Sequence, residues 1–151
     1  MLIVYTGNGK GKTTASLGQA IRALGEGKKV LMIQFIKGPW LSGEDIFLKK
    51  FKSKDFRIIK SGKGFVGIMG DRLPLSNHKK AAKEAMKLAE RAVIGQKHDL
   101  IILDEVNVAI NLKLISEKDV IKLVKKAANI NLVITGRNAP KRLIEMADIA
   151  T

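Results

Sequence analysis

The sequence contains no cysteine, and this absence excludes disulfides, thiolate zinc sites, iron–sulfur clusters and cysteine nucleophiles. Aromatic residues are also scarce, at 5% of the chain. The longest apolar runs, such as residues 100–103, are much shorter than the roughly 20 residues that a membrane-spanning helix needs. The first residues show no secretory or transit-peptide pattern. We therefore expect a cytoplasmic protein with no membrane among its partners.

The length of 151 residues is typical of one domain, so we expect residues 1–151 to form a single domain. Lysine and arginine number 28 against 14 acidic residues, which gives a net charge of +14. Such a surplus is typical of proteins with polyanionic partners, and equally of a lysine-rich solvated surface. Several lysines recur on the solvent side of an expected helix, with no aromatic residues between them: Lys79, Lys80, Lys83 and Lys87. This pattern favours the solvated surface, and nucleic acid is not an expected partner.

Short apolar runs alternate with segments of helical periodicity along the chain. The expected strands are residues 2–6, 29–36, 56–59, 99–104, 131–135 and 149–151. Helices are expected after the first glycine-rich turn, over 44–52 and 76–96, after the capping residue Ser116, and over 140–146. Because the strand runs are continuously apolar, they predict an α/β fold with a parallel sheet covered on both faces. Residues 61–75 show neither period, and a loop of this length is a candidate substrate loop.

A glycine-rich segment, residues 6–13, lies between the first expected strand and the first expected helix. It matches the phosphate-binding pattern GxxxxGK[ST] except that Thr6 replaces the first glycine. Its backbone N–H groups can surround phosphate oxygens at a helix amino terminus, Lys12 can contact phosphate, and Thr13 can bind Mg²⁺. The alternative is a simple glycine-rich turn with a helix cap. The expected nucleotide-binding residues are Gly7, Asn8, Gly9, Lys10, Gly11, Lys12, Thr13, Thr14 and Arg137.

Asp104 and Glu105 follow an apolar strand, where carboxylates can reach Mg²⁺ directly or through water. An acidic residue at such a place is also a common helix cap. Arg137 follows the next strand, so it is either a phosphate contact or a surface arginine in a turn. His78 and His98 have no partner at metal-ligand spacing, and we interpret both as surface residues.

Further motifs accompany the phosphate loop along almost the whole chain. They are Tyr5 to Ala15, Gln34 to Gly38 with Trp40, Gly43 and Glu44, then Leu103 to Glu105, Thr135 to Arg137, Ala139-Pro140 and Ala147-Asp148. In these residues the chain resembles the P-loop type of ATP:corrinoid adenosyltransferases, also called cob(I)yrinic acid a,c-diamide adenosyltransferases. Thr6 is a variant typical of that family.

The resemblance implies a three-layer P-loop NTPase fold of the RecA-like type, with strands in the order 3-2-4-5-1-6. It implies that cob(I)alt attacks C5′ of ATP and releases triphosphate, with ATP bound in reverse relative to most P-loop enzymes. Lys12, Thr13 and Glu105 would act in catalysis, and Thr13, Asp104 and Glu105 would bind Mg²⁺ or Mn²⁺. A homodimer and a flavin-type reductant protein are the expected protein partners.

The resemblance also implies that Phe65 and Trp40 contact the corrinoid. Many members carry a second aromatic residue two positions after the phenylalanine, where this chain has Gly67. Longer relatives have an amino-terminal extension that helps to close the corrin site, whereas this sequence begins at its first strand.

Two other functions compete with this interpretation. A RecA-like ATPase acting on nucleic acid would use Glu105 to polarise water and would bind single strands with a steep salt dependence. A nucleoside kinase such as thymidine kinase can also carry an acidic pair after a strand, but its usual zinc-binding cysteines are absent.

Overall fold

The computed structural model describes residues 1–68 and 70–151. Its strands are β1 (Leu2–Tyr5), β2 (Val30–Gln34), β3 (Phe56–Lys60), β4 (Leu100–Asp104), β5 (Asn131–Thr135) and β6 (Ile149–Ala150). Its helices are α1 (Lys12–Gly25), α2 (Gly43–Phe51), α3 (Leu75–Gly95), α4 (Val106–Asn111), α5 (Glu117–Lys126) and α6 (Lys141–Glu145).

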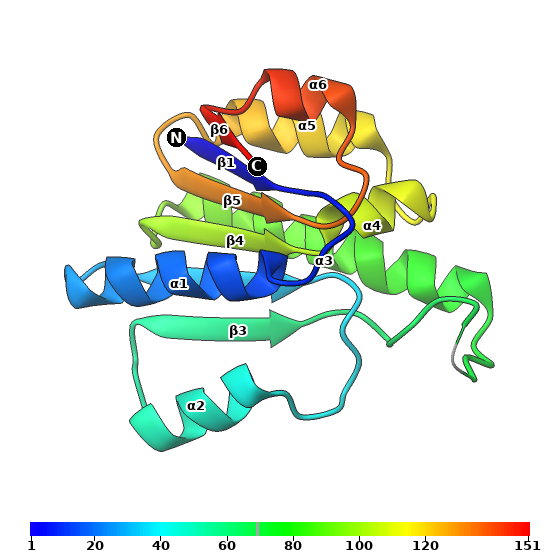
Figure 1. Cartoon of the computed structure of the whole chain (residues 1–151), viewed down its shortest axis with the longest axis horizontal. Coiled ribbons are helices and arrows are strands. Elements are labelled where there is room, and N and C mark those ends of the chain that lie inside the picture. Colours follow the sequence, from blue (N-terminus) through cyan, green and yellow to red (C-terminus); the bar gives the residue numbers. More distant parts are fainter. Residues whose placement is uncertain (69) are drawn as a thin grey trace.

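The strands form one six-stranded sheet in the order β3-β2-β4-β5-β1-β6 (Figure 1). Every neighbouring pair is parallel. Both the α/β class and the order 3-2-4-5-1-6 expected from the resemblance are therefore confirmed. Because β1, β5 and β4 are parallel neighbours, their carboxyl ends lie at one edge of the sheet, where α/β proteins bind ligands.

Apolar side chains on alternate strand positions build a separate core on each face of the sheet. On one face, Ile101 and Leu103 of β4 belong to a cluster with buried residues of α3, α4, α5 and α6. On the other face, Leu100 and Ile102 belong to a cluster with α1, against which Leu48 of α2 packs. This two-sided burial explains the continuously apolar strand segments and gives three layers.

The elements expected from periodicity are present, with ends that differ by a few residues. The strand expected over 29–36 ends at Gln34, because the chain turns after its last pairing with β4. Ser116 caps α5 by accepting a hydrogen bond from the Asp119 N–H at 3.2 Å. The short helix α4 was not predicted, because six residues in a buried segment show no clear period.

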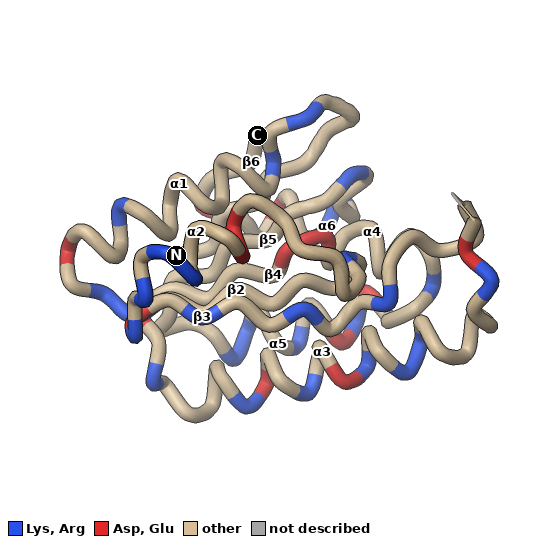
Figure 2. Tube along the Cα trace, turned by 90° about the horizontal axis from the view of Figure 1, so that it is seen from below, with Lys and Arg blue, Asp and Glu red and all other residues tan. Residues whose placement is uncertain are grey.

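The basic residues are spread over the molecule rather than gathered in one stripe, and many lie on the outer sides of α3 and α5 (Figure 2). All four lysines expected on the solvent side of α3 are exposed. Within the described residues, no helix is both long and apolar enough to cross a membrane.

Candidate active site

The phosphate loop connects β1 to α1 at the carboxyl edge of the sheet. Gly7 and Gly11 have left-handed backbones, with φ of 105° and 106°, which residues with a Cβ rarely adopt. Gly11 is the N-cap of α1, so the free N–H groups of the first turn face the loop. The side chains of Asn8, Lys10 and Thr14 are exposed. This arrangement is suited to binding phosphate through backbone N–H groups.

Lys12 begins α1, and its side chain folds back over the loop. Its Nζ atom donates hydrogen bonds to the carbonyl oxygens of Gly7 at 2.7 Å and Gly9 at 2.6 Å. These two bonds place a positive charge directly above the loop backbone, where a bound phosphate would lie. The ammonium group of Lys12 therefore lies at the phosphate loop, as the sequence predicts.

Asp104 is fully buried at the end of β4 and accepts hydrogen bonds from three neutral side chains. The hydroxyl groups of Thr13 and Thr135 donate to its Oδ1 atom, each at 2.8 Å. The Gln34 amide donates to its Oδ2 atom at 3.1 Å. The structure therefore unites Thr13 and Asp104, which lie far apart in the sequence, in direct contact beside the phosphate loop.

Glu105 is half-buried and has a left-handed backbone, with φ of 61°, at the N-cap of α4. Its backbone N–H donates to the Thr135 hydroxyl at 2.9 Å. Burial, and next the neighbouring Asp104 charge, raise the pKa of the Glu105 carboxyl, while Lys12 and Arg137 partly oppose this rise. A residue that combines a strained backbone with a partly desolvated carboxyl is typical of functional sites.

Two ion pairs hold α2: Glu44 pairs with Lys37 of the loop after β2, and Asp45 pairs with Lys60 at the end of β3. Glu44 also accepts a hydrogen bond from Gln34 at 3.1 Å. Burial alone would raise the pKa of Glu44, but the contacts with Lys37 and Gln34 outweigh it and lower the pKa to about 2. Because the Gln34 amide donates to both Asp104 and Glu44, it joins the Asp104 carboxyl to α2.

The described residues contain no group of three or more His, Cys, Asp or Glu side chains that could hold a metal ion. A cation at this site would therefore depend on the hydroxyl oxygen of Thr13 together with Asp104 and Glu105. This donor set is hard and oxygen-only, which suits Mg²⁺ or Mn²⁺.

Trp40 and Phe65, the expected corrinoid contacts, line one open hollow of about 220 Å³. The indole ring of Trp40 lies against two glycines, since a Cβ added at Gly38 or Gly64 would come within 2.7 or 2.8 Å of it. The Phe65 side chain is 48% exposed. The structure thus brings Trp40 and Phe65 together near the carboxyl edge, beside the loop that follows β3.

The expectation for His78 was wrong, because His78 is buried rather than on the surface. Its Nε2 atom lies 3.0 Å from Asp71 Oδ2, and the Asp71 carboxylate also accepts hydrogen bonds from the N–H groups of Gly67 and Leu73. His98, also expected on the surface, is half-buried, and burial lowers its pKa. His78 and Asp71 therefore fix the loop that carries Phe65 to the first turn of α3.

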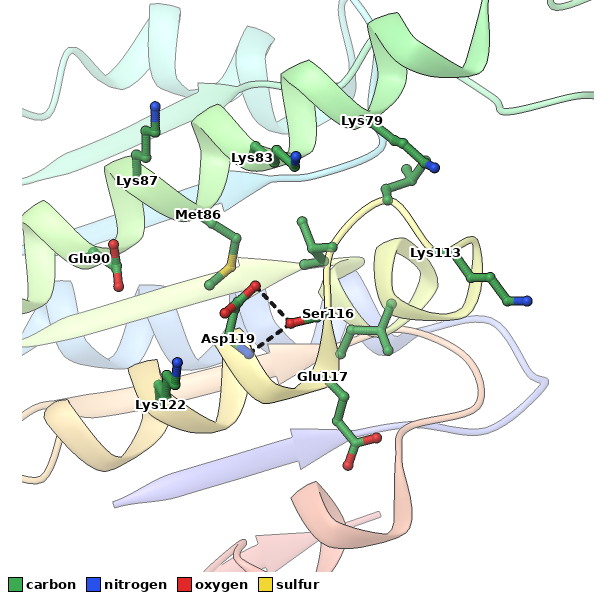
Figure 3. Close-up of a pocket in the computed structure, with 13 residues that line it drawn as sticks. Lys79, Lys83, Met86, Lys87, Glu90, Lys113, Ser116, Glu117, Asp119 and Lys122 are labelled. Atoms are coloured by element: carbon green, nitrogen blue, oxygen red, sulfur yellow. Dashed lines mark hydrogen bonds between the residues drawn. The ribbon is translucent and has the colours of Figure 1, made fainter.

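A larger hollow of about 740 Å³ lies between α3 and α5, away from the phosphate loop (Figure 3). Lys79, Lys83 and Lys87 of α3 line one side of it, and Lys122 of α5 lines the other. It shares no residue with the phosphate loop or the acidic pair. This hollow is therefore separate from the candidate active site at the carboxyl edge of the sheet.

Comparison with known proteins agrees with this geometry. The family model "ATP:corrinoid adenosyltransferase BtuR/CobO/CobP" matches residues 1–151. A corrinoid adenosyltransferase of Sinorhizobium sp is 33% identical over 153 residues, covering 100% of this chain and 70% of the relative. The corrinoid adenosyltransferase of Escherichia coli K12 is 34% identical, and the CobA enzyme of Salmonella typhimurium 32%, each covering 98% of this chain and 73% of the relative. The resemblance seen in the sequence is confirmed: this chain belongs to the ATP:corrinoid adenosyltransferase family.

Proposed function

We propose that one domain, residues 1–151, transfers the 5′-deoxyadenosyl group of ATP to the cobalt of a reduced corrinoid, in cobalamin biosynthesis or salvage. Cob(I)alt supplies an electron pair to C5′, so that a cobalt–carbon bond forms as the C5′–O5′ bond breaks. The pair from the broken bond leaves on triphosphate. The family match carries this proposal, and the contact between Thr13 and Asp104 beside the phosphate loop supports it.

Because cobalt is the nucleophile, the protein needs no serine, cysteine or histidine to attack ATP. Its task is to stabilise the negative charge that grows on the departing triphosphate. We assign this task to the backbone N–H groups of the phosphate loop and to Lys12, whose ammonium group lies above the loop. Arg137, which is exposed next to Glu105, is assigned to the same anion.

A divalent cation fits the residues at this site. Asp104 is a fully buried carboxylate whose three hydrogen-bond donors are neutral, so its charge remains uncompensated by them. We propose that Thr13, Asp104 and Glu105 hold Mg²⁺ or Mn²⁺. When bound, the cation would neutralise charge on the triphosphate oxygens.

On the corrinoid side, we propose that Trp40 and Phe65 contact the macrocycle from the hollow that they line. In this interpretation Phe65 displaces an axial ligand so that Co(II) can be reduced. The reduction needs an electron donor, for which we propose a flavin-type reductant protein. We also propose that the protein forms a homodimer and is located in the cytoplasm.

The function is tested by mixing the protein with ATP, Mg²⁺ and a chemically reduced corrinoid. The absorbance change of cobalt alkylation is followed, and the released phosphate species are identified. We expect alkylation with one triphosphate per adenosyl group transferred. Orthophosphate release without alkylation would instead identify an ATPase. A matched reaction with Co(II) and no reductant should give no product, because Co(II) lacks the required electron pair.

A further inference from the structure

Helix α2 departs from the usual amphipathic arrangement. Its two carboxylates lie on the inner side, where Glu44 pairs with Lys37 and Asp45 pairs with Lys60. None of its residues is fully buried, and Leu48 is the α2 side chain that packs against the core. A surface helix of a globular protein normally presents its polar face to water and its apolar face to the core.

The outer side of α2 is apolar. The exposed fractions are 46% for Ile46, 38% for Phe47 and 67% for Phe51. At 100° per residue these three positions fall on one face of the helix, with Lys50 between them. The rings of Phe47 and Phe51 stack on each other at a centroid distance of 4.2 Å. Clustered exposed apolar side chains of this kind mark an interaction surface.

The charge around this face is positive. Lys49, Lys50, Lys52 and Lys54 lie on α2 and in the turn that follows it, and all four are exposed, against one exposed carboxylate in the same turn, Asp55. The nearby carboxylates of Glu44 and Asp45 already have lysine partners from other segments. The surface formed by the outer face of α2 and these four lysines, which we call the α2 surface, therefore attracts an anion.

The combination of features identifies the kind of partner. A second copy of the chain docked at this surface would bring two sets of lysines together, and their repulsion opposes self-association through the α2 surface. A protein partner is also disfavoured, because lysine is depleted at the centre of protein interfaces, whereas Lys50 lies amid the apolar residues. At a bilayer surface, phenylalanine and isoleucine enter the boundary of the acyl chains while lysines extend to the lipid phosphates.

We propose that the α2 surface binds the surface of an anionic phospholipid bilayer. Such contact needs no membrane-spanning helix. The proposal therefore departs from the sequence-based expectation that no membrane is a partner. Helix α2 lies beside the edge strand β3 (Figure 1), and its outward residues belong neither to the phosphate loop nor to the acidic pair. A protein bound in this way keeps its nucleotide site free.

The proposal is tested by sedimenting the protein with vesicles made of equal amounts of phosphatidylglycerol and phosphatidylcholine. We expect binding to these vesicles, little binding to pure phosphatidylcholine, and release at about 1 M salt, where the Debye length is about 3 Å. Equal binding to both vesicle types, or none to either, would overturn the proposal.

Two double variants locate the contact. Lys49→Gln with Lys50→Gln should lower the partition coefficient about 25-fold, since each lysine near an anionic surface contributes about fivefold. Phe47→Ser with Phe51→Ser should lower it at least about tenfold, because the apolar contact is lost. Two controls on α3 should bind as the unchanged protein does: Ile94→Ser, at a side chain that is 69% exposed, and Lys83→Gln with Lys87→Gln.

The adenosyltransferase assay in solution should be unchanged for every variant, and circular dichroism should show every variant folded at the assay temperature, which separates loss of binding from loss of folding. Equal losses in the α2 and α3 variants would show a general charge effect and overturn the assignment to α2. Self-association of the unchanged protein that disappears with Phe47→Ser and Phe51→Ser would assign the surface to a second copy and also overturn the proposal.

Discussion

Lys12 combines two features that point to a role in charge stabilisation: it begins α1, and its ammonium group lies over the phosphate loop. Replacing Lys12 with alanine removes a charged donor from a place where negative charge develops. We expect turnover to fall by about 100-fold, or about 3 kcal/mol in the barrier. The measurement is the alkylation rate at saturating substrates, with the exposed Lys28→Ala as control. Unchanged turnover in Lys12→Ala would remove this residue from catalysis.

The ionised carboxyl of Glu105 should reduce the stability of the folded protein. Its pKa is raised in the folded state, chiefly by burial. The native state therefore holds more protons than the unfolded state between the two pKa values, and stability falls as pH rises through that window. Glu105→Gln should thus stabilise the protein at pH 7 and lose this advantage at pH values below the unfolded pKa.

The same Glu105→Gln variant should show weaker dependence of activity on Mg²⁺. Denaturant unfolding at a series of pH values and a metal titration of activity check the two effects. A variant that is less stable than the unchanged protein at pH 7 would contradict the sign, and an unaltered metal titration would exclude Glu105 from the metal site.

Phe65 can be tested for its assigned contact with the corrinoid. Because its side chain is 48% exposed, we expect Phe65→Ala to cost much less stability than the roughly 3–5 kcal/mol of a buried phenylalanine. The variant should lose far more activity when the reaction starts from Co(II) with a reductant than when it starts from Co(I). Equal losses from both starting states would reject the role in ligand displacement, and Gly67→Trp should then bring no gain with Co(II).

At the residue scale, the sequence predicts the members of the site better than their supporting contacts. Thr13 and Asp104 could be paired because a known loop pattern and an acidic strand end share one edge of a parallel sheet. Gln34 and Thr135 lay within the recognised motifs, but their bonds to Asp104 depend on strand neighbours that the sequence alone does not reveal. His78 was misplaced because its partner Asp71 belongs to a loop without periodicity.

At the element scale, the pair Lys37–Glu44 should control how firmly α2 is held. The lowered pKa of Glu44 means that its ionised form stabilises the fold. This contribution is fully present above the unfolded pKa of about 4.5 and is lost as pH falls through about 2. Glu44→Gln should therefore cost about 1–3 kcal/mol at pH 7, with allowance for the partial exposure of Lys37.

Denaturant unfolding at several pH values measures the Glu44 effect. The matched control is Glu145→Gln, which removes a largely exposed pair with Lys141 and should cost almost nothing. A difference between Glu44→Gln and the unchanged protein that stays constant from pH 7 to about pH 2 would contradict the assignment, because only an ionised carboxylate loses its contribution on protonation.

Elements were predicted well where a full period was visible and less well where it was not. The apolar stripe of α3 and the capping Ser116 of α5 were sufficient to place the ends of α3 and the start of α5 within about one residue. The two-residue strand β6 was identified from its apolar residues and its place in the alternation. Helix α4 was missed because its burial on several sides hides any amphipathic pattern.

At the scale of the whole molecule, periodicity accounts for a parallel sheet covered on both faces but not for its strand order. Several orders satisfy right-handed connections. The insertion of β5 between β1 and β4 came from the resemblance, and the pairing of Leu2 with Leu132 and of Leu100 with Asn131 agrees with it. That insertion has a functional consequence, because it places Thr135 of β5 beside Asp104.

Binding of ATP with a divalent cation should stabilise the whole fold. A ligand present at about 100 times its Kd stabilises the native state by about 2.7 kcal/mol, which for a chain of this length raises Tm by roughly 5–10 °C. We expect that rise with ATP and Mg²⁺, and a clearly smaller one with ATP and a chelator.

Asp104→Asn should abolish the difference between the two conditions, since Asp104 contacts Thr13 at the assigned cation site. The exposed Asp55→Asn is the control and should keep the difference. An equal rise in Tm with and without Mg²⁺ in the unchanged protein would show that the cation is not held by these residues, and the phosphate loop would then bind the nucleotide through its N–H groups and Lys12 alone.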